Sequence, residues 1–299
     1  MNEYSYSERH MGTDTTVSLI MDDRKKSERL AKQTFSVINT YETLFSRFLS
    51  DSELSILNRT GSHIVCEEFI DVLECSLELS RLTKGGFNPL VQVSKLGYRQ
   101  NFSEINNHGS EIEDAIYDID VNKIRIDKET RKVTLGISQK LDMGGVLKGY
   151  LASKLADEIM SDNNDCHGCI INIGGDLATR GLDELHEPFI FLLYNPITGE
   201  ETALPLTDTS LSTSGTYARV WQTNHGKKHH IVDGLSRKNP ETDLTSVSIN
   251  HHDGSMSEAL TKLFLVHGLK QALKIVPPTI FNYQYFCVSN DGKISSNMV

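Results

Sequence analysis

The sequence predicts an α+β fold in which antiparallel or mixed sheets carry singly inserted helices. Two patterns predict it: several strand-like segments follow one another without a helix between them, and helical segments occur one at a time. Of the 299 residues, 38% are hydrophobic and 23% charged, as in ordinary globular proteins. We find neither an internal repeat nor a low-complexity linker, so we expect a single domain over residues 1–299.

Four helices are predicted from apolar spacing. Apolar residues recur every three or four positions over 30–48, after a charged start at 22–26. A second helix should span Glu67–Leu82, because Lys84-Gly85-Gly86 supplies a basic end and a glycine stop. Two more are expected over residues 145–160 and 257–268.

Strands are predicted from alternation and turn residues. A hairpin should occupy residues 116–137, turning at 127–130, and a closing hairpin residues 281–294. Single strands are expected at 169–173, 189–194 and 245–249, and a polar loop at 100–114.

Charge and cysteine content exclude several classes. The net charge of −10 argues against a nucleic-acid partner. No apolar run reaches the roughly 18–20 residues that span a bilayer, and the N-terminus has no apolar secretory core. As written, the chain is expected in the cytoplasm, although an exported protein that had lost its leader would read the same. Cys166 and Cys169 form a lone CxxC, which we interpret as two cysteines entering a buried strand rather than a metal or redox site.

Five glycine-containing clusters are candidates for binding a phosphorylated ligand. Glycines at strand-to-helix junctions let backbone N–H groups approach a phosphate at a helix N-terminus. The segment from Asp142 to Tyr150 fits best, with an acid, two glycines and then Lys148 on the first helical turn. The clusters lie at residues 11–13, 85–89, 142–150, 174–176 and 212–217.

Two further groups of titratable residues have both a functional and an ordinary interpretation. His229-His230 precede Asp233, so one histidine is a candidate general base with an orienting acid; the alternative is a pair of surface histidines. Glu258 and Lys262 are four residues apart, which suits a helical ion pair. Beside a ligand, the carboxylate could instead hold a divalent cation and the lysine a phosphate.

In this order, the motifs resemble the ApbE family of FAD:protein FMN transferases over Met11 to about Gly268. The matching segments are Met11-Gly12-Thr13; Phe45-Ser46-Arg47-Phe48 with Asp51-Ser52-Glu53-Leu54 and Leu57-Asn58; Gly86-Phe87-Asn88-Pro89 with Leu96-Gly97-Tyr98; Leu141-Asp142-Met143-Gly144-Gly145 with Lys148-Gly149-Tyr150; Asn172-Ile173-Gly174-Gly175-Asp176; Thr213-Ser214-Gly215; His230-Ile231-Val232-Asp233; and Glu258-Ala259-Leu260.

The resemblance implies a T-fold-like ApbE domain and a defined reaction. FAD binds with its pyrophosphate near Mg²⁺, a Thr or Ser hydroxyl of an acceptor protein attacks the FMN phosphorus, and AMP leaves. His230 matches the proposed base, while Gly145 and Glu258 match metal-binding positions. The positions that match FAD contacts are Met11, Phe48, Gly86, Phe87, Asn88, Asp142, Lys148 and Ile231.

Three departures from the family pattern are present. Glu258 stands where the family has a metal-binding Asp, and Lys262 where it has a Thr; a lysine has only donors and cannot bind Mg²⁺. We hypothesise that Lys262 replaces part of the metal's charge, so that Mg²⁺ binds weakly or arrives with the substrate. After Asp233 the family's Pro-Arg-Thr-Gly is replaced by Gly234-Leu235-Ser236-Arg237, and no export signal is visible.

Two other functions stay open from the sequence. The same site could hydrolyse FAD to FMN and AMP, with water as the acceptor. A non-catalytic FAD-binding protein is the other alternative, which the altered metal position favours and the retained His230 disfavours.

Overall fold

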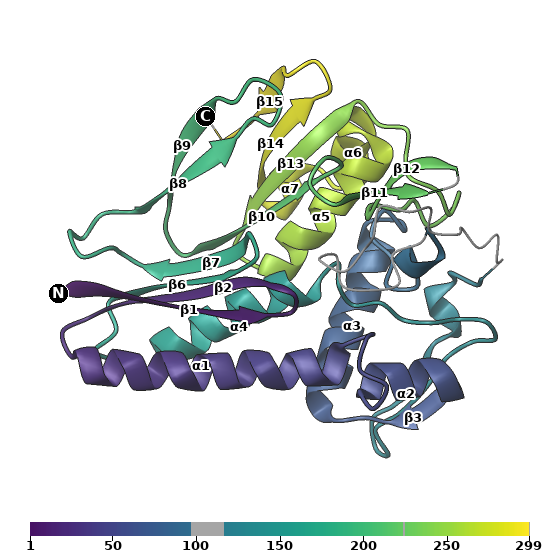
Figure 1. Ribbon diagram of the computed structural model, residues 1–299, viewed down its shortest axis with the longest axis horizontal. Helices are drawn as coiled ribbons and strands as arrows, with labels where there is room; N and C mark the ends of the chain where they lie inside the picture. Colours follow the sequence, from purple (N-terminus) through teal and green to yellow (C-terminus); the bar gives the residue numbers. More distant parts are fainter. Residues whose placement is uncertain (97–116, 224, 299) are drawn as a thin grey trace.

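A computed structural model describes residues 1–96, 117–223 and 225–298 (Figure 1). The predicted loop at 100–114 and the Gly97-Tyr98 pair lie outside these ranges. The helices are α1 (Arg24–Phe45), α2 (Glu53–Thr60), α3 (Glu67–Leu82), α4 (Leu147–Asp162), α5 (Gly254–His267), α6 (Leu269–Ile275) and α7 (Pro278–Phe281), with 3-10 turns η1 (Val93–Leu96) and η3 (Val121–Lys123).

An eight-stranded sheet organises the molecule, and all its described strand pairs are antiparallel. Its spatial order is β1 (Asn2–His10), β2 (Thr13–Met21), β6 (Gly168–Ile173), β7 (Asp176–Gly181), β10 (Thr209–Gly215), β13 (Leu244–His251), β14 (Gln284–Ser289) and β15 (Ile294–Ser296). Smaller sheets pair β3 (Ser62–Ile64) and β4 (Arg125–Asp127) with β5 (Lys132–Thr134), β8 (Phe189–Tyr194) with β9 (Glu201–Leu206), and β11 (Val220–Thr223) with β12 (Gly226–His229).

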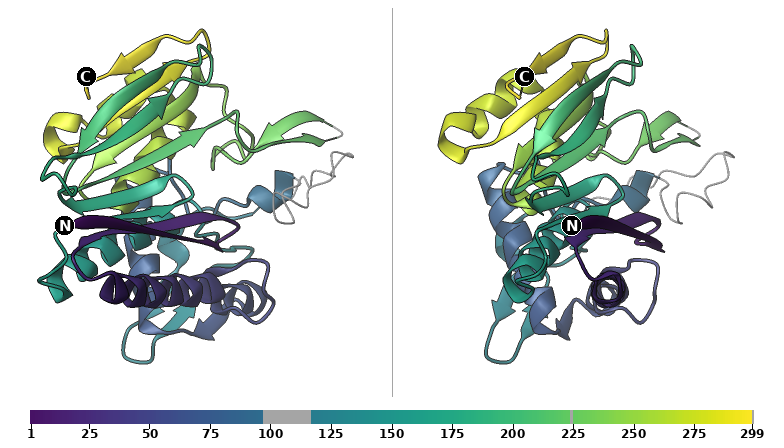
Figure 2. Two further views of the ribbon diagram at one scale, coloured as in Figure 1. Left: turned by 60° about the vertical axis from the view of Figure 1, so that its left-hand side comes forward. Right: turned by 90° about the vertical axis from the view of Figure 1, so that its left-hand side faces the viewer.

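Different elements cover the two faces of this sheet between β7 and β14. On one face, Val247 of β13 and Cys287 of β14 pack with α5 and α6 in a single hydrophobic cluster. On the other, Leu211 and Phe286 pack under the β8–β9 hairpin. Helix α4 crosses β6 and β7, and α1 runs beneath the β1–β2 hairpin (Figures 1 and 2). The sheet is therefore a buried platform here, and α4 and α5 lie next to each other on it.

The predicted α+β class with antiparallel pairing is confirmed, and several elements begin and end close to their predicted positions. Helix α3 spans Glu67–Leu82 as expected, and both predicted hairpins are present as β4–β5 and β14–β15. Cys166 and Cys169 are buried at the entry to β6, as interpreted. The single domain over 1–299 stays a prediction.

For other elements, the predicted first or last residue was wrong. Helix α1 ends at Phe45 because the chain turns extended at Ser46, so Phe48 lies in the following loop instead of on the helix. The hairpin predicted over 116–137 is shorter, since its first part forms η3 and Ile137 is exposed. Within the described ranges, no helix combines the length and the apolar character needed to cross a bilayer.

Two glycines let α4 and α5 approach backbone to backbone. An ideal Cβ on Gly149 would lie 2.2 Å from the carbonyl oxygen of Gly254, a distance that no side chain tolerates. Gly149 is in the first turns of α4 and Gly254 begins α5. This contact places the side chains of both helix N-termini side by side.

We predict that Gly149→Ala lowers the free energy of unfolding by about 1–3 kcal/mol, because the added methyl group forces the two backbones apart. The loss should appear although alanine favours a helix by about 1 kcal/mol over glycine. Urea denaturation measures it. Lys154→Ala on the exposed side of α4 is the control and should change stability by no more than about 0.5 kcal/mol; equal effects in the two variants would contradict the prediction.

Candidate functional site

Four charged side chains meet where α4 and α5 approach the start of β7, and we call them the charge tetrad: Lys148, Asp176, Glu258 and Lys262. Lys148 Nζ donates to an oxygen of Asp176 and, at 3.1 Å, to Glu258 Oε1. Lys262 Nζ donates to the same Oε1, also at 3.1 Å. Glu258 is fully buried, and the other three side chains are at most 16% exposed.

Local structure fixes each member of the tetrad. Lys148 is in the first turn of α4, whose N-terminus has no side-chain cap. Asp176 begins β7 directly after the Gly174-Gly175 turn, where both glycines have positive φ. Glu258 and Lys262 are one turn apart on α5, so the predicted helical ion pair exists.

Opposite charges set the protonation of the tetrad. Burial opposes ionisation of Glu258, but Lys148 and Lys262 outweigh it and lower the pKa of this carboxyl to about 2. Burial likewise opposes a charge on Lys148, yet Asp176 and Glu258 raise the pKa of its ammonium. Burial and the nearby Glu258 raise the pKa of Asp176, and burial lowers the pKa of Lys262. Glu258 is therefore ionised at neutral pH and holds the two lysines.

His230 lies close to the tetrad and is neutral at physiological pH. Burial, followed by the charges of Arg219 and Lys262, lowers the pKa of its imidazole to about 3. Its buried Nδ1 makes no hydrogen bond with the described residues. Asp233 does not hydrogen-bond to this Nδ1; its carboxylate instead accepts the N–H groups of Leu235 and Ser236 in its own loop.

The glycine-rich loops enclose the same region. An ideal Cβ on Gly145 would lie 3.2 Å from Phe87 and 3.6 Å from Lys262 Cε, so Gly145 borders the tetrad. Gly86 packs against Leu263, the residue after Lys262, and leaves no room for a Cβ. Ile231, which follows His230, is buried in the same hydrophobic cluster as Leu263. Five predicted site residues thus surround α5 near Lys262: Gly86, Phe87, Gly145, His230 and Ile231.

A second group of predicted residues lies along the loops that lead to the tetrad. Arg47 is 3.7 Å from Asp142, and its guanidinium stacks 4.7 Å above the Phe48 ring, which is 43% exposed. Asp142 Oδ1 also accepts the N–H of Gly144, two residues further along. Phe48 and Asp142 therefore form a separate, more exposed patch at the start of the loop that ends at Lys148.

Asn88 and Met11 are the predicted residues with the least direct contact to the tetrad. The Asn88 amide is already used within the protein, because Nδ2 donates to Ile119 O in a distant segment and Oδ1 accepts from the N–H of the nearby Leu90. Met11 has φ 51° in the β1–β2 turn. Thr13, at the end of that turn, fills the space beside Gly174, two residues before Asp176.

Of the two residues expected to hold Mg²⁺, Gly145 and Glu258, the second does not suit it. Glu258 Oε2 accepts the N–H of Gly149 at 2.9 Å, and Oε1 accepts two ammonium groups, so the protein's own donors occupy both carboxylate oxygens. Mg²⁺ requires free oxygen ligands in octahedral geometry. In the described parts of the chain, no three His, Cys, Asp or Glu side chains gather in one place.

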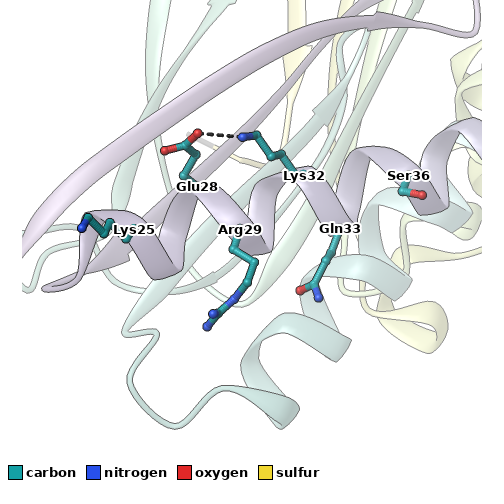
Figure 3. A pocket seen from close by; sticks show the side chains of 6 residues that line it. All are labelled: Lys25, Glu28, Arg29, Lys32, Gln33 and Ser36. Carbon is teal, nitrogen blue, oxygen red and sulfur yellow. Dashed lines mark hydrogen bonds and ion pairs between the residues drawn. The ribbon is translucent and has the colours of Figure 1, made fainter.

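An open pocket of about 420 Å³ lies elsewhere, on the solvent side of α1 (Figure 3). Its lining residues are Lys25, Glu28, Arg29, Lys32, Gln33 and Ser36. All six come from one helix, and the predicted site residues are not among them. This pocket on α1 is therefore separate from the charge tetrad.

The comparison with protein families decides the family. The family model described as the ApbE family matches residues 11–281, most of the chain.

The chain belongs to the ApbE family.

Two relatives match this chain over most of its length and most of their own. A FAD:protein FMN transferase from Klebsiella pneumoniae (strain 342) is 26% identical over 283 residues, which cover 90% of this chain and 84% of the relative. One from Treponema pallidum (strain Nichols) is 26% identical over 308 residues, which cover 92% of this chain and 82% of the relative.

Solved ApbE structures share the fold. The ApbE protein of Thermotoga maritima superposes with a TM-score of 0.87 at 20% identity, covering 99% of this chain and 97% of that one. The apo form of the Pseudomonas stutzeri flavinyl transferase ApbE gives a TM-score of 0.81 at 16% identity, with 99% and 94% covered. The predicted ApbE-like fold is confirmed.

The sequence patterns of this ApbE chain did not predict a role for two of the site residues, Asp176 and Arg47. Asp176 appeared only within the Gly174-Gly175-Asp176 turn, although an acid directly after two glycines at a strand boundary was a usable signal. Arg47 lay within a matching motif, but its contact with Asp142 joins segments that are distant in the sequence.

We predict that Lys148→Met lowers the free energy of unfolding by about 3–5 kcal/mol, because it leaves Asp176 buried without its partner cation. Adding Asp176→Asn to this variant should restore part of the loss, with a coupling energy of about 1–3 kcal/mol. Urea denaturation of the wild type, both single variants and the double variant completes the cycle. Strictly additive losses would contradict a direct Lys148–Asp176 interaction.

Proposed function

We propose that this chain is an FAD:protein FMN transferase that attaches FMN from FAD to a Thr or Ser hydroxyl of an acceptor protein and releases AMP. The observation that carries the proposal is the charge tetrad with a neutral imidazole beside it. Two lysines near a base suit a reaction that must bind a pyrophosphate and remove a hydroxyl proton. The activity named for the relatives supports the same reaction.

His230 is the proposed general base. The acceptor oxygen attacks the FMN phosphorus, its proton passes to the imidazole, and the bond from that phosphorus to the AMP phosphate oxygen breaks. Its low pKa in the free protein keeps His230 unprotonated before FAD arrives. The negative pyrophosphate then favours the protonated imidazole, so FAD itself strengthens the base.

Lys148 and Lys262 are proposed to bind the pyrophosphate, with Glu258 holding both ammonium groups in place. Of the three N–H donors on each ammonium, Lys148 keeps one and Lys262 keeps two besides those directed to carboxylates. In the loops that enclose the tetrad, Gly86, Phe87 and Ile231 are proposed to contact FAD. The parts of FAD that lie further from the pyrophosphate would contact Met11, Phe48, Asn88 and Asp142. We assign no Mg²⁺ to Gly145 and Glu258, because three donors of the protein already bind the Glu258 carboxylate.

We predict that His230→Ala lowers kcat for flavin transfer by about a hundredfold or more, the contribution typical of a general base. The assay combines FAD with an acceptor protein that an established FAD:protein FMN transferase modifies, and follows in-gel flavin fluorescence and intact mass. The FAD dissociation constant should change less than threefold. Undiminished transfer would remove His230 from the mechanism.

The same assay separates the other candidate functions. FMN that appears free in solution instead of on the acceptor would identify an FAD pyrophosphatase. Tight FAD binding without release of AMP or FMN would identify a binding protein.

We predict that kcat/KM for FAD stays nearly constant between pH 7.5 and 5.5. This parameter reports the free enzyme, in which burial lowers the His230 pKa from 6.5 to about 3, so the base stays deprotonated over this range. A histidine with an ordinary pKa would lose about tenfold in activity by pH 5.5. The exposed His186→Asn variant is the control, and its profile should match the wild type. A wild-type midpoint near 6.5 would contradict the low pKa.

A further inference from the structure

The position between Gly145 and Glu258 holds the side chain of Lys262. Lys262 Cε is 3.6 Å from an ideal Cβ on Gly145, and its Nζ is 3.1 Å from Glu258 Oε1. These are the two residues that the family resemblance assigns to a metal ion. A cation of the protein's own therefore lies between them.

Three hydrogen-bond donors of the protein bind the Glu258 carboxylate, which a metal ion would need as a ligand. Lys148 and Lys262 share Oε1, and the Gly149 N–H takes Oε2. The carboxylate is fully buried on α5, so it cannot turn toward solvent to offer other lone pairs. Two ammonium groups at one oxygen also repel any divalent ion that approaches.

We propose that Lys262 is a resident cation that binds the FAD pyrophosphate in place of a divalent metal, so that FAD binding and FMN transfer by this chain need no metal. The inference rests on the proposed function. Bond making and breaking are as described above: the acceptor oxygen joins the FMN phosphorus, AMP leaves with the electron pair, and no redox partner takes part. Lys262 Nζ stabilises the negative charge that the leaving phosphate gains.

The chemistry of lysine explains why this replacement works. An ammonium group on a flexible stem is a point charge with three donors, which suits phosphate oxygens. Glu258 accepts one of these donors, so the remaining N–H groups of Lys262 can turn toward the ligand. Glu258 thus positions the cation and does not coordinate the phosphate.

The test measures FAD binding to the full-length chain by isothermal titration, in EDTA and again in millimolar MgCl₂. We expect the wild-type dissociation constant to differ less than twofold between the two conditions. Lys262→Thr removes the ammonium group and supplies a hydroxyl oxygen. It should bind FAD at least tenfold more weakly in EDTA and recover most of that loss in MgCl₂.

Two further variants control for structural damage. Lys154→Thr removes one positive charge from the exposed side of α4 and should bind FAD like the wild type in both conditions. Lys262→Met keeps the length of the side chain without a charge or an oxygen ligand, so it should lose affinity in EDTA and gain nothing from MgCl₂. It also provides the comparison if Lys262→Thr fails to fold.

The outcomes separate this inference from the proposed function. A wild-type affinity that rises tenfold or more with MgCl₂, or Lys262 variants that bind FAD normally in EDTA, would overturn the resident cation. Transfer assays of the wild type in EDTA should proceed within threefold of the rate in MgCl₂. If FAD binding depends on Lys262 as expected but no FMN is transferred in either condition, the role of Lys262 as a resident cation is supported and the proposed transferase activity is rejected.

Discussion

The buried Glu258 carboxylate is the constraint on which the site depends. A fully buried negative charge is costly unless opposite charges and hydrogen bonds compensate it, and here Lys148, Lys262 and the Gly149 N–H do so. These partners come from two helices whose backbones touch at Gly149 and Gly254. The close packing of α4 and α5 and the charge pairing at Glu258 therefore occur at the same place.

This arrangement connects the fold with the proposed chemistry. The sheet supplies a buried platform with α4 and α5 on it, and the turn before β7 brings Asp176 to Lys148. His230 arrives from the end of β12, on a segment anchored by the buried Ile231. Burial keeps His230 neutral, while Asp176 and Glu258 raise the pKa of the Lys148 ammonium, so a base and a charged lysine lie close together.

Sequence patterns predicted the elements whose signals are local. Helix α3 carries its acidic start and its glycine stop within the chain segment itself, so both ends were predictable. Strand β1 was missed because it lies at the edge of the sheet with most of its residues exposed, so that hydrophobic residues do not mark it in the sequence. Helix α5 begins three residues earlier than predicted, since Asp253 caps it through the Ser255 N–H.

The site was predictable as a set of motifs but not as an arrangement. Lys148 and Glu258 were identified individually, yet their contact joins residues 110 positions apart, which no periodicity encodes. Closeness in sequence made Asp233 one possible partner for His230, but its carboxylate bonds to the backbone of its own turn, as turn residues commonly do. The departure at Lys262 was visible at once, but only the structure shows that its side chain lies between Gly145 and Glu258.

A crystal structure of this chain with bound FAD tests the central claim most directly. The account predicts pyrophosphate oxygens within hydrogen-bonding distance of Lys262 Nζ, with the FMN phosphorus on the side that faces His230. A pyrophosphate bound away from the tetrad, or a metal ion on Glu258 with Lys262 displaced, would contradict it.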